Sequence, residues 1–144
     1  MKVENAVLKI SNLSKSYEKK QVLAPVDLTI ESGECVVLCG GNGAGKSTLI
    51  KLITGIEKKT TGTFSFSVNK KKTFGFMPDD MTFPAELSAL EVLQYYGNFL
   101  GVSEERIHST LKRVGMWEHR NGKVGSFSKG MSQRVNLAQA LLAD

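Results

Sequence analysis

The residues with the clearest chemical potential lie in the glycine-rich segment GGNGAGKST, which spans residues 40–48. Its first eight residues, Gly40 to Ser47, match the pattern G-x-x-x-x-G-K-[ST] in full. Glycines allow the backbone to wrap around an anion, so that successive N–H groups point inward. Lys46 can reach the β- and γ-phosphates of a nucleoside triphosphate, and the hydroxyl of Ser47 can bind Mg²⁺. The segment therefore predicts a site for a nucleoside triphosphate and its metal ion.

The surroundings of this segment favour a phosphate site over a chance glycine-rich turn. CVVLCG, before it, is apolar on both faces, as in a strand buried in a parallel sheet. STLIKLITG, after it, predicts a helix with its apolar side chains inward and a stop at Gly55. A helix that starts at Lys46 places the positive end of its dipole at the same anion. The predicted phosphate-binding residues are Gly40, Gly41, Asn42, Gly43, Ala44, Gly45, Lys46, Ser47 and Thr48.

The remaining elements follow from hydrophobic spacing. Segments 6–17 and 22–30 read as two early strands joined by the polar turn EKKQ, and 61–68 and 72–78 read as two more. Ser88 and Glu91 have the spacing of a capping box, which predicts a helix that ends at Gly101. A further helix is predicted from Ser103 to Gly115, and a last one from near Met131. Strands gather in the first half and helices in the second, so a loop at 78–84 is a candidate hinge.

Composition limits the class of protein. The 144 residues suggest one domain at most, and no apolar run approaches the roughly 20 residues that span a bilayer. The start of the chain lacks the apolar core of a signal peptide, which favours a cytosolic protein. The net charge of +5 allows nucleic-acid binding, but the lysine clusters fall in predicted turns without interleaved aromatic residues. They are interpreted as solvated surface.

The two cysteines lie four residues apart within the apolar run before the glycine-rich segment. A zinc site needs about four ligands, and His108 and His119 are distant in sequence. Cys35 and Cys39 are therefore predicted to be buried free thiols in a reducing compartment.

GGNGAGKST and FSKGMSQRV, taken together, resemble the nucleotide-binding subunit of ATP-binding cassette (ABC) transporters, in order along nearly the whole chain. The resemblance implies an α/β P-loop NTPase core with an antiparallel β subdomain and a helical subdomain. Tyr17 matches the aromatic that stacks on adenine in this family. Stacking fits the physics of an aromatic face. The alternative is an ordinary tyrosine at a strand end.

The segment FSKGMSQR resembles the signature motif of the family, LSGGQ followed by Q-R, with matches at Ser128 and Gly130. Phe127, Lys129 and Met131 depart from it, and SKGM variants are similar to those of two-component exporters. In the family this motif contacts the γ-phosphate of ATP held by the other subunit of a head-to-tail dimer. The alternative is a helix N-cap at Ser128 and nothing more.

The segment FGFMPDD resembles the loop that carries a glutamine in the family and joins its two subdomains. Asp79 occupies the glutamine position, which makes it a candidate metal contact, direct or through water. The neighbours Met81, Phe83 and Pro84 either meet a transmembrane partner, as the resemblance implies, or pack within the loop.

The resemblance also implies residues that would follow Asp144: a buried strand that ends in the metal-binding aspartate, called Walker B, and a catalytic glutamate. No catalytic residue is assigned, since no carboxylate present can replace them by position. We therefore expect one incomplete domain, with a β-rich P-loop core over 1–77 and the helical part over 78–144. A fragment of a longer protein is expected, with a native short domain as the alternative.

The complete protein is expected to bind ATP and Mg²⁺, to pair with a second ATP-binding subunit, and to drive a transmembrane permease from the cytoplasmic face of the membrane. The 144 residues alone are expected to bind nucleotide weakly and not to hydrolyse it. Two alternatives stay open. One is a soluble ABC-type ATPase that acts on ribosomes or DNA, and the other is a non-hydrolysing regulatory module.

Overall fold

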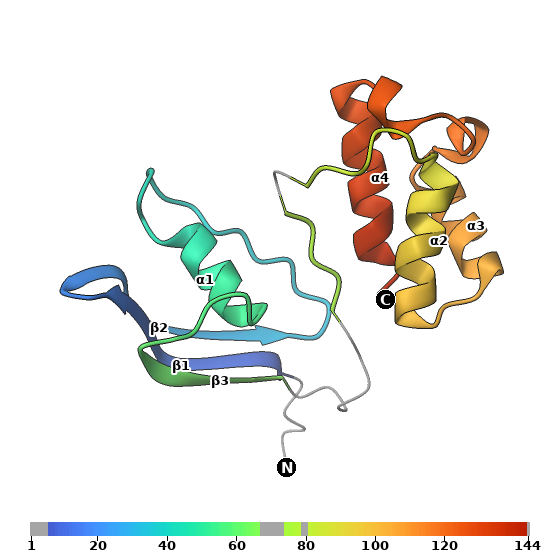
Figure 1. The fold of residues 1–144 in the computed structure, drawn as a ribbon. Helices are drawn as coiled ribbons and strands as arrows, with labels where there is room; N and C mark the ends of the chain where they lie inside the picture. Colours follow the sequence, from blue (N-terminus) through green and yellow to red (C-terminus); the bar gives the residue numbers. More distant parts are fainter. Residues whose placement is uncertain (1–5, 67–73, 79–80, 144) are drawn as a thin grey trace, which may run out of the picture. The chain divides into compact units, whose positions relative to one another are not determined.

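The computed structural model describes residues 6–66, 74–78 and 81–143. Its contacts divide the chain into two compact units, here called the β unit (Met1–Lys70) and the helical unit (Lys71–Asp144), which we describe separately (Figure 1). The sequence predicts the boundary between the two parts at residues 77–78.

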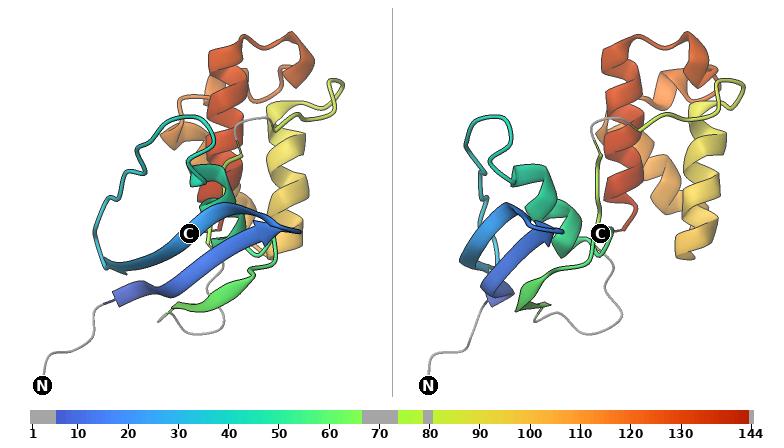
Figure 2. Two further views of the ribbon diagram at one scale, coloured as in Figure 1. Left: turned by 90° about the vertical axis from the view of Figure 1, so that its left-hand side faces the viewer. Right: turned by 60° about the vertical axis from the view of Figure 1, so that its left-hand side comes forward.

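The β unit contains an antiparallel sheet with strand order β2-β1-β3 (Figure 2). Its strands are β1 (Ala6–Tyr17), β2 (Lys20–Glu31) and β3 (Thr61–Phe66). Apolar residues alternate along the strands and so share one face of the sheet. On this face Ile10 of β1 pairs with Leu28 of β2 on one side and with Phe64 of β3 on the other. The predicted strands at 6–17 and 22–30 are confirmed, and the third forms over 61–66.

Helix α1 (Lys46–Ile53) covers this sheet through Leu49 and Leu52, which are buried with side chains of β1 and β2. It ends as predicted, because Thr54 caps it and Gly55 adopts a left-handed conformation. The expected inward position of Ile50 is wrong, since this side chain is exposed. The burial of Leu49 and Leu52 fixes where the N-terminus of α1 lies against β2.

The expected buried strand at 35–39 is not formed. Residues 34–40 are irregular, and Val36 and Val37 are 42% and 74% exposed. Cys35 and Cys39 are exposed free thiols, so their predicted burial is also wrong. The physical reason is that a strand apolar on both faces needs neighbouring strands, and within residues 6–66 no strand pairs with this segment. The part of the predicted strand 72–78 that is described, 74–78, is irregular as well.

The helical unit packs three helices around one core, α2 (Ala89–Leu100), α3 (Glu104–Arg113) and α4 (Lys129–Leu141). Two short 3₁₀ helices, η1 (Trp117–His119) and η2 (Val124–Ser126), lie between α3 and α4. The core is formed by apolar residues from all three helices, with Leu93, Leu111 and Val135 fully buried. The expected helices are confirmed. The last one begins at Lys129 rather than near Met131.

The start of α2 carries the predicted capping box. The Ser88 hydroxyl accepts a hydrogen bond from the Glu91 N–H at 3.2 Å, and the Ser88 N–H donates to Glu91 Oε2 at 2.8 Å. The helix ends at Gly101, which caps it in a left-handed conformation as predicted.

This capping box makes the helical unit sensitive to acid. The backbone hydrogen bond from Ser88, followed by that of its hydroxyl, lowers the pKa of Glu91 from its ordinary value of 4.5. A lowered pKa means that the stabilisation is fully present above pH 4.5 and is lost as the pH falls through the lowered pKa. Glu91→Gln should therefore flatten the loss of stability between about pH 5 and pH 3, as measured by urea unfolding.

The matched control is Glu118→Gln, which removes an exposed carboxylate from η1 in the same unit. It should leave the acid-dependent part of the stability unchanged. Equal pH profiles for Glu91→Gln and the wild type would show that the capping box carries no linkage.

Candidate phosphate-binding site

The N-terminus of α1 meets β2 at Gly45. Gly45 caps α1 with φ 90° and ψ 4°, and its carbonyl accepts the first helical hydrogen bond from Leu49 N at 2.8 Å. A Cβ at this position would lie 2.9 Å from the Val22 carbonyl oxygen and 2.8 Å from Leu23 Cδ1. Only glycine meets both demands, a left-handed backbone and a close approach to β2. Gly45, the glycine directly before the motif's lysine, therefore sets how closely the loop lies against the sheet.

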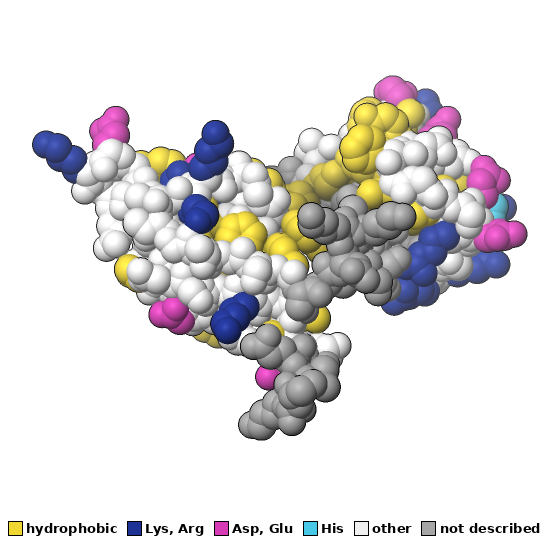
Figure 3. All heavy atoms as spheres, turned by 90° about the horizontal axis from the view of Figure 1, so that it is seen from below, with side chains coloured by type: hydrophobic (Ala, Val, Ile, Leu, Met, Phe, Trp, Pro, Cys, Tyr) yellow, Lys and Arg dark blue, Asp and Glu magenta, His cyan; other side chains and the backbone are white. Residues whose placement is uncertain are grey.

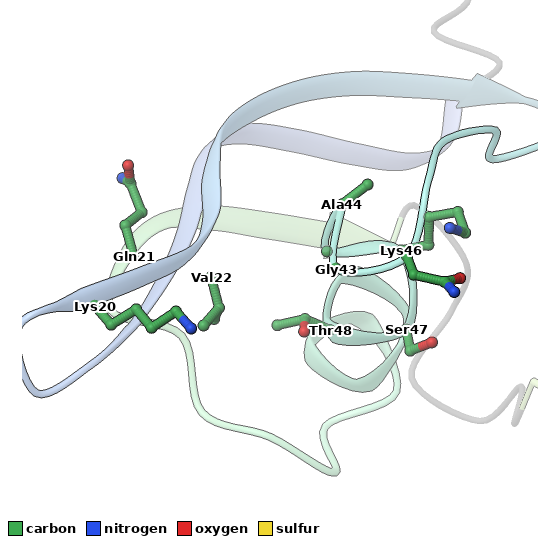
Figure 4. Close-up of a pocket in the computed structure, with 10 residues that line it drawn as sticks. Lys20, Gln21, Val22, Gly43, Ala44, Lys46, Ser47 and Thr48 are labelled. Atoms are coloured by element: carbon green, nitrogen blue, oxygen red, sulfur yellow. The ribbon is translucent and has the colours of Figure 1, made fainter.

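A pocket of about 470 Å³ opens between the start of α1 and the beginning of β2 (Figure 4). In Figure 4 the side chains of Lys20 and Val22, from β2, and of Thr48, from α1, extend toward the same space. The pocket is lined by Lys20, Gln21, Val22, Asn42, Gly43, Ala44, Gly45, Lys46, Ser47 and Thr48. The chain thus brings seven consecutive predicted phosphate-binding residues, 42–48, to one pocket.

Lys46 supplies a positive charge at the mouth of the loop. Its Nζ donates hydrogen bonds to the carbonyl oxygens of Gly40, at 2.7 Å, and Gly41, at 2.9 Å. These bonds draw the first glycines of the motif toward the ammonium group, although neither glycine lines the pocket. The two carbonyls that accept these bonds are neutral, so an anionic oxygen would be a stronger partner for the same ammonium group. The arrangement can bind an anion without burying an unpaired charge.

The residues present fit a magnesium ion that arrives with the phosphates. Ser47 is exposed at the first turn of α1, where its hydroxyl can bind a hard cation. Within 6–66, 74–78 and 81–143, no three His, Cys, Asp or Glu side chains gather as a metal site. Most oxygen ligands would therefore come from phosphate and water, as Mg²⁺ prefers. The other metal candidate, Asp79, lies outside the described residues.

Tyr17 ends β1 next to this pocket but does not line it. It pairs with Lys20 across the hairpin, and Lys20 is a lining residue. Tyr17 is 47% exposed, and the Lys15 ammonium lies 4.5 Å from the centroid of its ring. A hydrogen-bonding interaction with the Glu57 carboxylate raises the pKa of the Tyr17 phenol. An accessible aromatic ring therefore lies beside the phosphate pocket, and its contact with adenine stays a prediction.

Sequence reasoning missed Lys20, Gln21 and Val22 as lining residues. Their signal was the hairpin itself, because antiparallel pairing of segments 6–17 and 22–30 brings the residues after the turn close to Tyr17. In the structure the turn is shorter than EKKQ, and Tyr17 pairs with Lys20. In Figure 3 the basic side chains visible on the β unit stand apart from one another. Lys20 is placed at the pocket by its position in β2.

The second predicted site, Ser128 to Met131, lies in the helical unit at the start of α4. The Ser128 hydroxyl caps the helix by accepting a hydrogen bond from Met131 N at 3.3 Å. Ser128, Lys129 and Gly130 are exposed, whereas Met131 packs against the helical core. Three of these residues can therefore be reached by a ligand or partner at a helix N-terminus. Both the cap and a contact with phosphate in trans are compatible with this geometry.

For the loop before α2, the sequence allows either packing within the loop or contact with a partner. Phe83 packs against the helical core, edge-on to Tyr96 at 6.2 Å between ring centroids. Pro84 is exposed, and Met81 lines a small pocket beside Phe76 and Leu100. Packing thus accounts for Phe83. In the described part of the chain, no helix is long and apolar enough to cross a membrane.

Comparison with known proteins identifies the architecture. A family model described as ABC transporter matches residues 23–144. The lantibiotic transport ATP-binding protein SrtF of Streptococcus pyogenes is 37% identical over 141 residues, covering 94% of this chain and 62% of SrtF. The zinc import ATP-binding protein ZnuC of Pseudomonas aeruginosa is 36% identical over 140 residues, covering 97% of this chain and 51% of ZnuC. The chain thus spans about half to two thirds of the length of these relatives.

A solved structure of an ATP binding subunit of an ABC transporter is 29% identical, with a TM-score of 0.82. The match covers 95% of this chain and 62% of that structure. The expected α/β fold of the ABC ATPase type is confirmed by this likeness. The buried strand expected before the glycine-rich segment is not formed in the structure, where residues 34–40 are irregular.

Proposed function

The chain belongs to the ABC transporter family, and from this membership we propose that residues 40–48 bind the phosphates of MgATP in an ATP-binding subunit. The observation that carries the proposal is the pocket at the start of α1, which Lys46, Ser47 and Thr48 line together with residues 42–45. A left-handed glycine at the helix N-cap and a free helix end favour an anion there. Lys46 supports it with an ammonium group whose hydrogen bonds, among the residues that the structure describes, go to neutral carbonyls.

The proposed roles divide within the pocket. The backbone N–H groups of 42–48 and the ammonium group of Lys46 bind phosphate oxygens. The Ser47 hydroxyl binds Mg²⁺, and the metal would neutralise phosphate charge when bound. Tyr17 stacks on the base, while Asp79 is proposed as a further metal contact. Mg²⁺ and the base contact rest on the resemblance of motif and position.

For the whole protein, we propose a peripheral subunit at the cytoplasmic face of a membrane. It pairs head-to-tail with a second ATP-binding subunit, so that Ser128, Lys129 and Gly130 contact the γ-phosphate held by the partner. ATP binding and hydrolysis then drive a transmembrane permease. Export is proposed from the SKGM variant and from SrtF, a relative named for lantibiotic transport. The exposure of Ser128 to Gly130 at a helix N-terminus supports the contact in trans.

Residues 1–144 by themselves are proposed to bind ATP without hydrolysing it. None of the ten pocket-lining residues carries a carboxylate that could act on the attacking water. The experiment combines calorimetric titration of residues 1–144 with MgATP and an assay of phosphate release. We expect saturable binding without turnover. Absence of binding contradicts the proposed site, and turnover that Lys46→Ala abolishes contradicts the proposed inactivity.

A further inference from the structure

A partly buried ion pair between Lys15 and Glu57 lies beside Tyr17 at the end of β1. Lys15 is a charged residue that is only 8% exposed. Its Nζ donates to Glu57 Oε1 at 2.8 Å and to the Lys58 carbonyl oxygen at 2.6 Å. A lysine is rarely buried unless its charge is paired, because removing the charge from water costs free energy. Packing of the sheet alone does not require a charged residue at this position.

The same pair lies against the Tyr17 ring through its lysine. Lys15 and Tyr17 are two positions apart in β1, and the ammonium group lies 4.5 Å from the ring centroid. The Glu57 carboxylate interacts with the Tyr17 hydroxyl, which raises the pKa of this phenol and lowers that of the carboxyl, where the Lys15 hydrogen bond is the largest cause. One face of the ring is thus covered by a cation, and the Glu57 carboxylate holds that cation.

Glu57 also connects Tyr17 to the phosphate site. Its backbone N–H donates to the Lys51 carbonyl oxygen at 3.0 Å, in the last turn of α1. The N-terminus of the same helix forms the phosphate pocket. After Glu57 the chain is tied to β1, because Thr60 N donates to the Ser14 carbonyl at 3.0 Å. One helix therefore fixes both the phosphate pocket and the group that holds Tyr17.

We propose that Lys15 and Glu57 are positioning residues, which hold the Tyr17 ring so that its open face receives the base of a nucleotide bound at residues 40–48. This inference rests on the proposed function. Lys15 occupies one face of the ring, which leaves the other for stacking, and Glu57 holds the Lys15 ammonium group in that place. A restrained ring loses less conformational entropy when the base stacks on it. The pair therefore acts on the base and not on the phosphates.

The test compares MgATP with magnesium triphosphate, the inorganic anion without a base, by calorimetric titration of the chain. Tyr17→Ala sets the full contribution of the base, which should be about fivefold to a hundredfold in ATP affinity. Glu57→Gln and Lys15→Met should each weaken ATP binding about threefold to tenfold and leave triphosphate binding within about twofold. A merely structural role would weaken both ligands alike.

Glu31→Gln is the matched control, because it removes an exposed carboxylate from the end of β2 in the same unit. It should change neither affinity. Loss of both ligands in Lys15→Met would indicate a misfolded variant, and the milder Glu57→Gln then decides. If the ratio of ATP affinity to triphosphate affinity is unchanged in Glu57→Gln, the positioning role is overturned. Triphosphate binding would still support the phosphate site in that case. Failure of the wild type to bind either ligand overturns both proposals.

Discussion

Replacing Lys46 by alanine should weaken the binding of MgATP about a hundredfold. Two of the residues that line the pocket carry a positive charge, Lys46 and Lys20. Charge-assisted hydrogen bonds to a phosphate are roughly twice as strong as neutral ones, and two such bonds would be lost. Calorimetric titration, with the nucleotide in excess, measures the change.

Lys51→Ala is the control for the loss of charge, since Lys51 is exposed in the last turn of the same helix. Its effect on affinity should stay within about threefold. Lys46 also holds the carbonyls of Gly40 and Gly41, so the melting temperature of both variants should be recorded. Equal affinities for Lys46→Ala and Lys51→Ala would contradict the assignment of the anion site.

Replacing Gly45 by alanine should destabilise the β unit by about 2–4 kcal/mol. Part of this cost is the left-handed backbone at φ 90°, and the rest is the contact of the new Cβ with the Val22 carbonyl and the Leu23 side chain. Separation of α1 from β2 would also open the phosphate pocket. Urea unfolding followed by far-UV circular dichroism measures the stability of the sheet and helices together.

Gly43→Ala separates the two causes. Gly43 has φ 83°, yet no heavy atom lies within 4 Å of a Cβ built there. This variant should therefore lose only about 1–2 kcal/mol. Trp117, the single tryptophan, reports on the helical unit and should show unchanged unfolding in both variants. Equal losses of stability for Gly43→Ala and Gly45→Ala would mean that the close contact between Gly45 and β2 contributes nothing to the cost of the substitution.

Local patterns predicted most of the elements that position the site. The motif at 40–47, the capping box at Ser88 and Glu91, and the stop at Gly101 depend on residues at most seven positions apart. Their hydrogen bonds form within one turn, so the sequence alone specifies them. The late start predicted for α4 has a local cause too, because Met131 is its first apolar residue although Ser128 is the cap.

Contacts between distant segments could not be predicted in this way. The apolar run at 35–39 indicates a buried strand, but burial of both its faces depends on neighbours far along a chain. The cysteines followed that interpretation and are exposed for the same reason. Lys15 and Glu57 are 42 positions apart, and neither residue type marks them as a pair. Only the return of the chain after α1 brings them together beside Tyr17.

The most direct test of the phosphate site is a titration of the isotope-labelled chain with MgATP, followed through its backbone amide resonances. We predict saturable shifts that are largest for the amides of residues 42–48, because these N–H groups would donate to the phosphate oxygens. Lys46→Ala should weaken these shifts at the same nucleotide concentration. Nucleotide-induced shifts that are absent from 42–48, or that are concentrated elsewhere in the chain, would contradict the account.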